Sequence, residues 1–249
     1  KRKKIKTVIH SAAYTFPNES ELKKKIYFIN NIKKTIKFID YCKKSKVENF
    51  IFLSSSNVYR FNSRNNKVLK PENYYGFTKL YIERYLKKKV FFNTIILRLF
   101  NIAGFIKNFD FIEYKSKFRR IMPKISSAIK DNKIIEIYGK KKGKKFQTSI
   151  RDYLYIEDLL NLIKIILKNK IKNKKFDVGS GSPISLYKII KIFEKKSKKK
   201  LRYIFKKRRK GELQYTCSKK NSINLKDWKP KKNIYRIIES TLIWDRHKT

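Results

Sequence analysis

Glycine, proline and methionine are scarce in this chain, which has 7 Gly, 5 Pro and 1 Met among its 249 residues. Cysteine and histidine are equally rare, with 2 of each. Two cysteines cannot build a disulfide framework, so Cys42 and Cys217 are expected to be reduced thiols of a cytoplasmic protein. So few potential ligands also leave no plausible zinc cluster. No apolar run approaches the roughly 20 residues that a membrane-spanning helix needs, so we expect no membrane partner.

Acidic residues are few as well, since 19 Asp and Glu stand against 66 Lys and Arg, for a formal net charge of +47. Such a charge can indicate a nucleic-acid partner. The basic residues are spread along the whole chain, however, and Lys, Asn, Ile, Phe and Tyr dominate it as AT-rich codons would dictate. This pattern favours genomic drift over selected basicity. We therefore predict no specific nucleic-acid partner, although so basic a surface should bind polyanions in a salt-dependent way.

Strand-like and helix-like segments alternate along the chain, and 41% of its residues are hydrophobic, which is enough for a core. The predicted strands are residues 7–10, 49–53, 94–97, 175–178 and 201–205. The predicted helices are residues 19–44, 74–88, 157–167, 186–195 and 233–244. The lysine-rich residues 140–145 are predicted to form a loop. This alternation predicts an α/β fold with a doubly wound parallel sheet, which binds ligands at the carboxyl ends of its strands.

A tyrosine and a lysine, Tyr75 and Lys79, lie four residues apart at the start of a predicted helix. On a helix this spacing places both side chains on one face. The lysine charge favours the phenolate form of the tyrosine, which can act as a general base. The serine block Ser54–Ser56 ends the preceding predicted strand. A hydroxyl, a phenol and an ammonium group after successive strand ends would suit removal of a proton from an alcohol.

Five further blocks occur in a definite order around the serine block and the Tyr–Lys pair. They are TVIHSAA at 7–13, LRLFNIAG at 97–104, SIRDY at 149–153, FDVGSG at 176–181 and RRKGEL at 208–213. Together these blocks resemble the extended short-chain dehydrogenase/reductase family, also described as the NAD-dependent epimerase/dehydratase family. Within it they look most like the epimerases that act at C4 of UDP-hexoses. The resemblance runs from Lys6 to Trp244.

The resemblance implies a Rossmann-like sheet, incomplete at the N-terminus, with a smaller C-terminal lobe for the nucleotide sugar. Residues 1–115 would form a partial NAD-binding domain to which residues 152–178 return, and residues 116–249 would form most of the substrate lobe. The glycine-rich turn that binds the NAD pyrophosphate is absent from the sequence. The chain begins at the family's fourth strand, so we expect that roughly 60–70 residues precede Lys1 in the complete protein. True loss of this half from the gene is the alternative.

Carried over residue by residue, the resemblance implies interconversion of UDP-glucose and UDP-galactose through transient NAD-dependent oxidation at sugar C4. Tyr75 would take the proton of the 4-hydroxyl, Lys79 would lower the pKa of Tyr75, and Ser55 would bind the sugar hydroxyl and relay its proton. The residues expected to bind NAD are Ala12, Ala13, Asn30, Ser54, Tyr75, Lys79 and Phe100. The residues expected to bind the UDP-sugar are Ser55, Asn101, Arg151, Arg209, Glu212 and Tyr215.

Several of these residues also have a structural explanation. The serine block could cap a turn, Asn30 could be an exposed polar residue of a helix, Phe100 could belong to the core, and Asp152 beside Arg151 could form a structural ion pair. The resemblance also implies that Tyr215, as a bulky residue, would favour UDP-glucose and UDP-galactose over the bulkier N-acetyl sugars. These alternatives stay open at the level of sequence.

Departures from the family's pattern leave the substrate open. Glu212 stands where Asp is usual, Arg120 where a substrate-binding Asn is expected, and Arg60 where a glycine is common. A nucleotide-sugar 4,6-dehydratase is disfavoured, because its Asp-Glu pair is replaced by Ser56 and Asn57.

Other functions remain as alternatives to an epimerase of UDP-hexoses. Another epimerase or reductase of the family, a catalytically degenerate remnant and a basic nucleic-acid binder all remain open. The joint presence of Ser55, Tyr75 and Lys79 argues against decay. Members of the family commonly dimerise through a four-helix interface, so the resemblance implies a homodimer built on residues 19–44 and 74–88.

Overall fold

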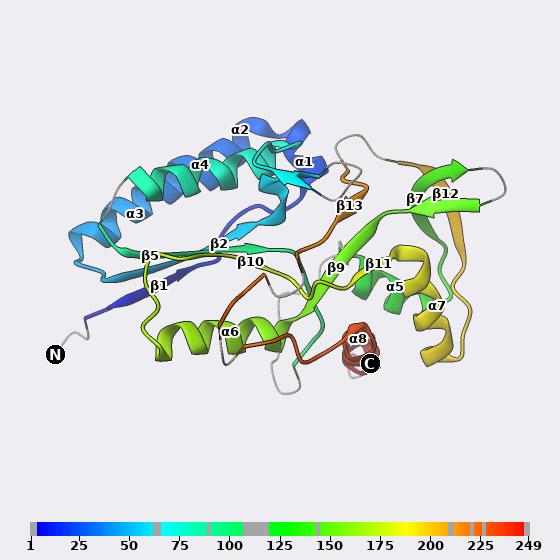
Figure 1. Cartoon of the computed structure of the whole chain (residues 1–249). Coiled ribbons are helices and arrows are strands. Elements are labelled where there is room, and N and C mark those ends of the chain that lie inside the picture. The colour runs from blue at the N-terminus through cyan, green and yellow to red at the C-terminus, as the bar shows by residue number, and fades with distance from the viewer. Residues whose placement is uncertain are drawn as a thin grey trace. The chain divides into compact units, whose positions relative to one another are not determined.

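The computed structural model describes residues 4–61, 66–88, 91–106, 120–142, 145–208, 212–219, 222–225 and 228–246. The chain divides into two compact units (Figure 1). The first unit comprises Lys1–Phe100, Ile166–Val178 and Arg209–Leu213. The second unit comprises Asn101–Ile165, Gly179–Arg208 and Gln214–Thr249.

A four-stranded parallel sheet forms the centre of the first unit. Its strands, in spatial order, are β1 (Thr7–His10), β2 (Asn49–Ser55), β5 (Asn93–Leu99) and β10 (Lys175–Val178). Ile51 of β2 pairs with Ile9 of β1 on one side and with Ile95 of β5 on the other. Near-continuous hydrophobic strands of this kind are typical of buried parallel sheets. The four predicted strands and the parallel α/β class are confirmed.

Helices α1 to α4 lie over one face of this sheet (Figure 1). They are α1 (Pro17–Leu22), α2 (Lys24–Tyr27), α3 (Lys34–Lys44) and α4 (Tyr74–Lys88), with a π-helical segment, η1 (Phe28–Lys33), between α2 and α3. Helix α4 has the predicted bounds. Its buried side chains pack with those of β2 and α3 in a core that includes Phe50, Ile82 and Ile39.

The predicted single helix over residues 19–44 is wrong, because the chain leaves helical geometry at Lys23, with φ −119° and ψ 41°. The break allows α1 to meet the start of α4. Ser20 Oγ accepts the main-chain N–H of Tyr75 at 2.9 Å, and Glu21 Oε1 accepts that of Tyr74 at 2.6 Å. The first N–H groups of a helix have no partner within the helix. Capping of α4 by α1 therefore competes with continuation of the helix through Lys23.

The connection from β2 to α4 contains three short elements. They are the 3-10 turn η2 (Ser56–Val58) and the strands β3 (Arg60–Phe61) and β4 (Lys67–Val68), which pair antiparallel. Val58 and Tyr59 pack with Leu80 of α4 in a small buried cluster. The connection is therefore anchored to α4 by packing as well as by the chain.

Two sheets form the second unit. In one, β9 (Ile150–Tyr155) pairs with β6 (Asn101–Ala103), β11 (Pro183–Ser185) and β13 (Tyr215–Thr216). In the other, β7 (Ile135–Lys142) lies between β12 (Tyr203–Lys207) and β8 (Lys145–Thr148). The helices are α5 (Ile121–Lys130), α7 (Leu186–Ser197), α8 (Ile234–Arg246) and most of α6 (Ile156–Lys168) (Figure 1). Helices α6, α7 and α8 are confirmed, and the strand predicted at 201–205 lies two residues later.

The loop predicted for residues 140–145 is largely wrong. Strand β7 continues to Lys142 and β8 begins at Lys145, with Lys140 opposite Gln147 in an antiparallel pair. Backbone pairing satisfies the N–H and C=O groups here whatever the side chains are, so a run of lysines does not exclude a strand. Residues 143 and 144 lie outside the described residues. In the described part of the chain, no helix is long and apolar enough to cross a membrane.

Candidate active site

The serine block closes β2 with two side chains that make different contacts. Ser54 Oγ donates a 2.6 Å hydrogen bond to Oε1 of Glu83 on α4. Ser55 Oγ instead accepts hydrogen bonds from the main-chain N–H and the side-chain Nδ2 of Asn57, both at 3.2 Å. Successive side chains of a strand point to opposite faces, which explains why neighbouring serines have separate partners. Both serines are buried.

A chain of amide hydrogen bonds leads from Ser55 to the first turn of α4. Asn57 Oδ1 accepts a 2.9 Å bond from Nδ2 of Asn73, the residue just before the helix. Asn73 Oδ1 in turn accepts the main-chain N–H of Gly76 at 2.8 Å. An Asn that precedes a helix and accepts from its third N–H is a favourable cap. The same side chain therefore starts α4 and holds the turn that follows Ser55.

Gly76 lets α4 approach this turn closely. A Cβ atom at this position would lie 2.1 Å from the main-chain oxygen of Asn57, a separation that real atoms do not reach. Any side chain would push the start of α4 away from the turn. The glycine between Tyr75 and Phe77 is therefore a requirement of the contact between η2 and the helix that carries Tyr75.

Tyr75 and Lys79 lie one turn apart on α4, and both are buried, with exposed fractions of 7% and 4%. Lys79 Nζ donates a 2.7 Å hydrogen bond to the main-chain oxygen of Leu53 on β2. The same nitrogen lies 4.8 Å from the centre of the Phe52 ring, within cation–π range. The structure thus attaches the predicted lysine to the strand that ends in Ser55.

Burial lowers the pKa of Lys79 to about 8, although the charge of Glu83 opposes this effect. Burial, and after it the charge of Lys79, lowers the pKa of His10 to about 4. His10 stacks on Phe38 and Phe52, with ring centres 5.5 and 5.9 Å apart, in the apolar surroundings that disfavour its charged form. Of these two groups, Lys79 is therefore the one that is charged at neutral pH, and His10 is neutral.

Glu83 is the buried counter-charge of this region, with 2% of its surface exposed. Besides the Ser54 hydroxyl, its carboxylate accepts Nε of Arg98 at 2.9 Å and Nη2 of Arg98 at 2.5 Å. Lys175 Nζ lies 3.8 Å from the same carboxylate. Bidentate Arg–carboxylate contacts are among the stronger polar interactions in proteins. Glu83 therefore ties α4 to β2, β5 and β10.

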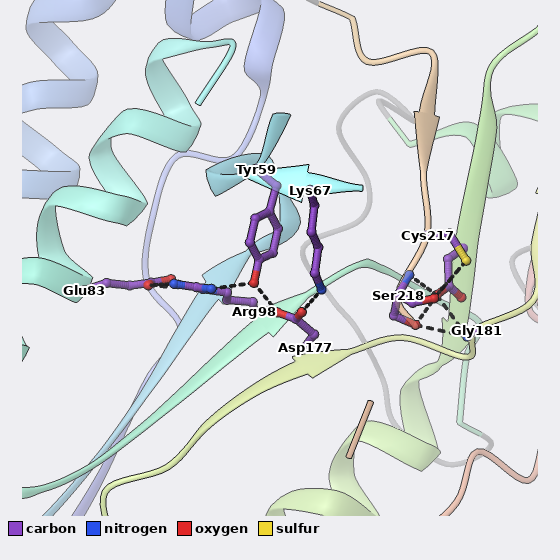
Figure 2. A network of polar contacts seen from close by, with 9 residues as sticks. Tyr59, Lys67, Glu83, Arg98, Asp177, Gly181, Cys217 and Ser218 are labelled. Atoms are coloured by element: carbon purple, nitrogen blue, oxygen red, sulfur yellow. Dashed lines mark hydrogen bonds and ion pairs between the residues drawn. The ribbon is translucent and has the colours of Figure 1, made fainter. Parts of the chain in front are cut away.

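The network continues from Arg98 to the end of β10 (Figure 2). Arg98 donates to the phenolic oxygen of Tyr59, and that hydroxyl donates a 2.8 Å bond to Asp177. Lys67 of β4 forms an ion pair with the same carboxylate. Burial, together with the charge of Asp177, raises the pKa of Tyr59, so the phenol stays protonated and can donate. Tyr59 and Lys67, which both belong to the connection between Ser55 and Tyr75, are thus bound to the end of β10.

The residues predicted around the end of β1 lie at or near the surface. Ala12 is exposed, and Ala13 and Asn30 are half-buried. Asn30 donates a 3.1 Å bond to the side chain of Asn31. The buried Asn31, which sequence reasoning missed, binds both main-chain groups of Tyr14 at 2.9 and 3.0 Å.

Asn31 also donates a 3.2 Å bond to Oγ1 of Thr78 on α4. This side chain therefore fixes the segment that follows β1 to the helix that carries Tyr75 and Lys79. The doubled asparagine at 30–31 was the only sequence signal, and it did not tell which of the two is buried.

Phe100, predicted beside the cofactor, ends the first unit. It is buried, its N–H donates a 2.9 Å bond to the main-chain oxygen of Val178, and its ring meets Phe61 edge-on. These contacts are compatible with a place for Phe100 in the core and also with a place beside the cofactor. Asn101, the first residue of the second unit, donates a 3.2 Å bond to the main-chain oxygen of Asp152.

The other predicted substrate residues are distributed as follows. Arg151 donates to the main-chain oxygens of Ile150 at 2.9 Å and Gln214 at 3.2 Å, and thereby supports the pairing of β9 with β13. Tyr215 of β13 is half-buried, and burial raises its pKa. Glu212 is half-buried in the first unit. Arg209 lies outside the described residues.

Asp152 is fully buried and serves as a hydrogen-bond acceptor within the second unit. It accepts the N–H and hydroxyl of Ser180 at 2.8 and 2.6 Å, those of Ser218 at 3.0 and 2.6 Å, and the N–H of Gly181 at 3.0 Å. Figure 2 shows Gly181 and Ser218 of this cluster, together with Cys217, whose Sγ lies 3.9 Å from Oδ2 of Asp152. Among the described residues, the carboxylate is held by hydroxyl and amide donors and not by the ion pair considered from sequence. Its role in the unit is structural.

The geometry of Lys79 suits a bound group that carries hydroxyls. A lysine ammonium has three donors, and only the one directed at Leu53 has a hydrogen-bond acceptor among the described residues. A ribose-like hydroxyl beside Tyr75 would satisfy a second donor. Within the described ranges, no group of three or more His, Cys, Asp or Glu side chains gathers as a metal site would require.

Comparison with known proteins assigns the chain to a family. A model of the NAD dependent epimerase/dehydratase family matches residues 1–179. The chain belongs to this family. The predicted resemblance is therefore confirmed at the level of the family.

Two curated relatives from the family illustrate its range of reactions. UDP-glucose 4-epimerase from Lactobacillus helveticus is 30% identical over 203 residues, which cover 78% of this chain and 62% of that protein. The dTDP-4-dehydro-6-deoxyglucose reductase from Escherichia coli is 30% identical over 206 residues, which cover 80% of this chain and 61% of that protein. This chain thus spans about three fifths of the length of these two relatives.

A solved structure from the family shares the fold. The UDP-glucose 4-epimerase from Bifidobacterium longum, in complex with NAD+ and UDP, matches with a TM-score of 0.85 and 24% identity. The match covers 98% of this chain and 77% of that chain. The predicted Rossmann-like α/β class is therefore confirmed.

Proposed function

We propose that this protein is an NAD-dependent 4-epimerase that interconverts UDP-glucose and UDP-galactose. The observation that carries the proposal is the buried Lys79, one turn from Tyr75 on α4 and hydrogen-bonded to the strand that ends in Ser55. Membership of the family and the likeness to an epimerase over 78% of the chain support it. Substrate and activity are carried over from relatives longer than this chain, so they stand as proposals.

Tyr75 acts as the general base in this proposal. The charge of Lys79 favours the phenolate, which takes the proton from the 4-hydroxyl of the sugar. The electron pair of the broken O–H bond forms the C4 carbonyl as the hydrogen on C4 departs as hydride. Ser55 binds the same sugar oxygen. When bound, NAD supplies a hydride acceptor that is regenerated in every turnover.

The residues present fit the nicotinamide and ribose half of NAD. Lys79 has hydrogen-bond donors without an acceptor among the described residues, and these could serve a ribose hydroxyl. The exposed Ala12, two residues after β1, offers a small side chain that a ring can approach. The NAD contacts proposed in addition to Tyr75 and Lys79 are Ala12, Ala13, Asn30, Ser54 and Phe100. The sequence contains no glycine-rich turn for the pyrophosphate.

The nucleotide sugar is proposed to contact residues of the C-terminal part, since residues 116–249 would form most of the substrate lobe and residues 1–115 with 152–178 the NAD-binding domain. An arginine suits a diphosphate because its planar guanidinium can bind two oxygens at once. The proposed substrate residues are Ser55, Asn101, Arg151, Arg209, Glu212 and Tyr215.

A reductase is the second candidate, because the Escherichia coli reductase is as similar to this chain as the Lactobacillus helveticus epimerase is. Such an enzyme would consume a reduced nicotinamide cofactor and leave the sugar at a lower oxidation state. A 4,6-dehydratase is disfavoured, since Ser56 and Asn57 provide no acid or base for loss of water.

A homodimer located in the cytoplasm completes the proposal. Exposed apolar side chains occur on α1, α2 and α4, including Leu22, Ile26, Phe77 and Tyr81. Exposed apolar patches often mark protein–protein contacts. These are the segments in which a helical dimer interface was predicted.

The proposal is tested with the full-length protein, UDP-galactose and NAD, by following the appearance of UDP-glucose by chromatography. A parallel assay supplies a 4-keto nucleotide sugar together with NADH or NADPH. Formation of UDP-glucose without net consumption of NAD supports a 4-epimerase. Turnover that consumes NADH or NADPH would replace it with the reductase. Failure to convert any nucleotide sugar, together with failure to bind NAD, would contradict both and leave a degenerate remnant.

A further inference from the structure

The hydroxyl of Ser55 has both of its acceptor positions filled by one residue. A serine oxygen has two lone pairs and carries one hydrogen. Asn57 donates to this oxygen twice, from its main-chain N–H and from Nδ2, at 3.2 Å each. Among the described residues, the hydrogen of the Ser55 hydroxyl has no acceptor. The hydroxyl is therefore arranged to donate outward and not to accept.

The direction of these hydrogen bonds is fixed from the backbone of α4. The main-chain N–H of Gly76 can only donate, so the group of Asn73 that meets it at 2.8 Å must be the oxygen Oδ1. The Nδ2 of Asn73 then faces Asn57 at 2.9 Å and requires an oxygen there. Asn57 consequently turns its own Nδ2 toward Ser55. The direction of each hydrogen bond, through Asn73 and Asn57 to Ser55, is therefore set by the main-chain N–H of Gly76, which can only donate.

We propose that Asn57 fixes the Ser55 hydroxyl as a hydrogen-bond donor, so that Ser55 holds and polarises the C4 oxygen of the sugar but does not carry its proton. The inference rests on the proposed function and assigns Asn57 as a positioning residue for it. A relay through Ser55 would need a free lone pair to receive the sugar's hydrogen. Tyr75 then takes the proton directly, forming its O–H bond as the sugar O–H bond breaks.

A donor fixed in this way suits the reaction. Negative charge develops on the C4 oxygen as its proton leaves, and a donor already aimed at that oxygen stabilises the charge without reorganisation. The proton relay expected from the resemblance is the competing account. A third account gives Asn57 only a structural role, as the residue that closes the turn η2.

Two substitutions separate these accounts in the full-length enzyme. In Asn57→Asp a carboxylate oxygen replaces the Nδ2 donor, so the Ser55 hydrogen turns toward it and is lost to the sugar. We expect kcat to fall about 100-fold with little change in KM, as for other small losses of alignment. Asn57→Ala keeps the main-chain donor and frees one lone pair, so we expect a smaller fall. A relay predicts that Asn57→Ala equals or exceeds the wild-type rate, which would overturn the proposal.

The double variant Ser55→Ala/Asn57→Asp distinguishes positioning from a structural role. If Asn57 acts through the Ser55 hydroxyl, Asn57→Asp costs no further activity once that hydroxyl is gone. A structural role predicts that the two losses in rate multiply, which would overturn the proposal. Asn169→Asp is the matched control, because it makes the same change of charge at an exposed position.

A measurement without turnover tests the geometry itself. The side-chain amide of Asn57 gives an NMR signal that is identified by its absence in Asn57→Asp. We expect this signal to move upfield and to exchange faster with solvent in Ser55→Ala than in the wild type. An unchanged signal would show that the hydrogen bond is absent and would overturn the proposal. A shifted signal in a protein that converts no UDP-sugar would instead place the failure in the proposed function.

Discussion

Lys79 Nζ donates a 2.7 Å hydrogen bond to the main-chain oxygen of Leu53, and this contact joins the helix that carries Tyr75 to the strand that ends in Ser55. The acceptor is an uncharged carbonyl, so the contact does not neutralise the buried ammonium. Its counter-charge, Glu83, lies one turn further along α4 and is already bound to Arg98. The fold therefore keeps a cation in a place where burial opposes it, and this has consequences for stability.

Lys79→Met should stabilise the fold at neutral pH while abolishing activity. The pKa of Lys79 is about 8 in the folded protein, against an ordinary value of 10.5 for a lysine side chain in the unfolded chain. Between these values the unfolded chain binds more protons, so the free energy of unfolding contributed by Lys79 rises with pH. Below pH 8 the whole penalty is present, on the order of 3 kcal/mol before the lost hydrogen bond is counted. The methionine variant has no such penalty.

Urea unfolding of both proteins at pH 7, 8, 9 and 10 checks this expectation. The stability advantage of Lys79→Met should shrink as the pH rises from 8 toward 10.5, because the wild type recovers. Lys164→Met, at an exposed position of α6, serves as control and should show no such trend. A constant difference between wild type and Lys79→Met across this range would contradict the assignment.

Tyr75→Phe removes the proposed general base and keeps the buried ring. We expect kcat to fall by about 10²–10⁴-fold, the usual contribution of general acid–base catalysis, with the fold intact. Initial rates of UDP-galactose conversion and thermal unfolding followed by circular dichroism measure the two effects. Tyr81→Phe, a partly exposed tyrosine of the same helix, is the matched control and should keep its activity. A rate within a few-fold of wild type for Tyr75→Phe would refute the mechanism.

Short-range patterns were sufficient to predict α4 and the pair that it carries. Its apolar spacing gave both of its ends, and the i,i+4 relation placed Tyr75 and Lys79 on one face. The break at Lys23 was not predictable in this way, because the apolar positions continue through it. What decides the break is that Ser20 caps the backbone of Tyr75, a residue far along the chain. Periodicity contains no information about such a partner.

The polar contacts of the candidate site were the hardest part to predict. Two neighbouring serines look alike in sequence, yet Ser54 joins the Glu83 network and Ser55 the Asn57 chain. Which hydroxyl enters which network depends on the face of the strand and on the elements that lie over each face. The roles of Asn57 and Asn73 have the same origin, since these residues meet only because Gly76 lets α4 approach.

Glu83→Gln tests the buried network. The change leaves Arg98 and Lys175 near an uncharged amide, and breaking a buried ion pair by removing one partner costs about 3–5 kcal/mol. Glu239→Gln removes one partner of an ion pair with Lys196 whose side chains are each 38% exposed, and we expect it to cost at most about 1 kcal/mol. Chemical denaturation of the two variants and the wild type at one pH compares them. Equal losses in the two variants would contradict the role given to Glu83.

Gly76→Ala should destabilise the protein although it adds a better helix former. In an ordinary helix the change would stabilise by roughly 0.5–1 kcal/mol. Here the new Cβ would lie 2.1 Å from the main-chain oxygen of Asn57, so α4 must move, which we expect to cost about 1–3 kcal/mol. Arg84→Ala, at an exposed position of the same helix, is the control. Denaturation midpoints measure both, and a stabilised Gly76→Ala would show that the close contact is absent.

The exposed aromatic side chains of α4 test the proposed homodimer. Phe77 and Tyr81 are 43% and 42% exposed, lie four residues apart on one face of the helix, and have ring centres 6.2 Å apart. Phe77→Glu would bury a charge in a dimer interface, so we expect the mass measured by light scattering to fall from that of a dimer to that of a monomer. Phe205→Glu changes an equally exposed phenylalanine, 41%, on β12 and should leave the dimer unchanged. Dissociation by both variants would point to a general effect of the charge, and a monomeric wild type would rule out the dimer altogether.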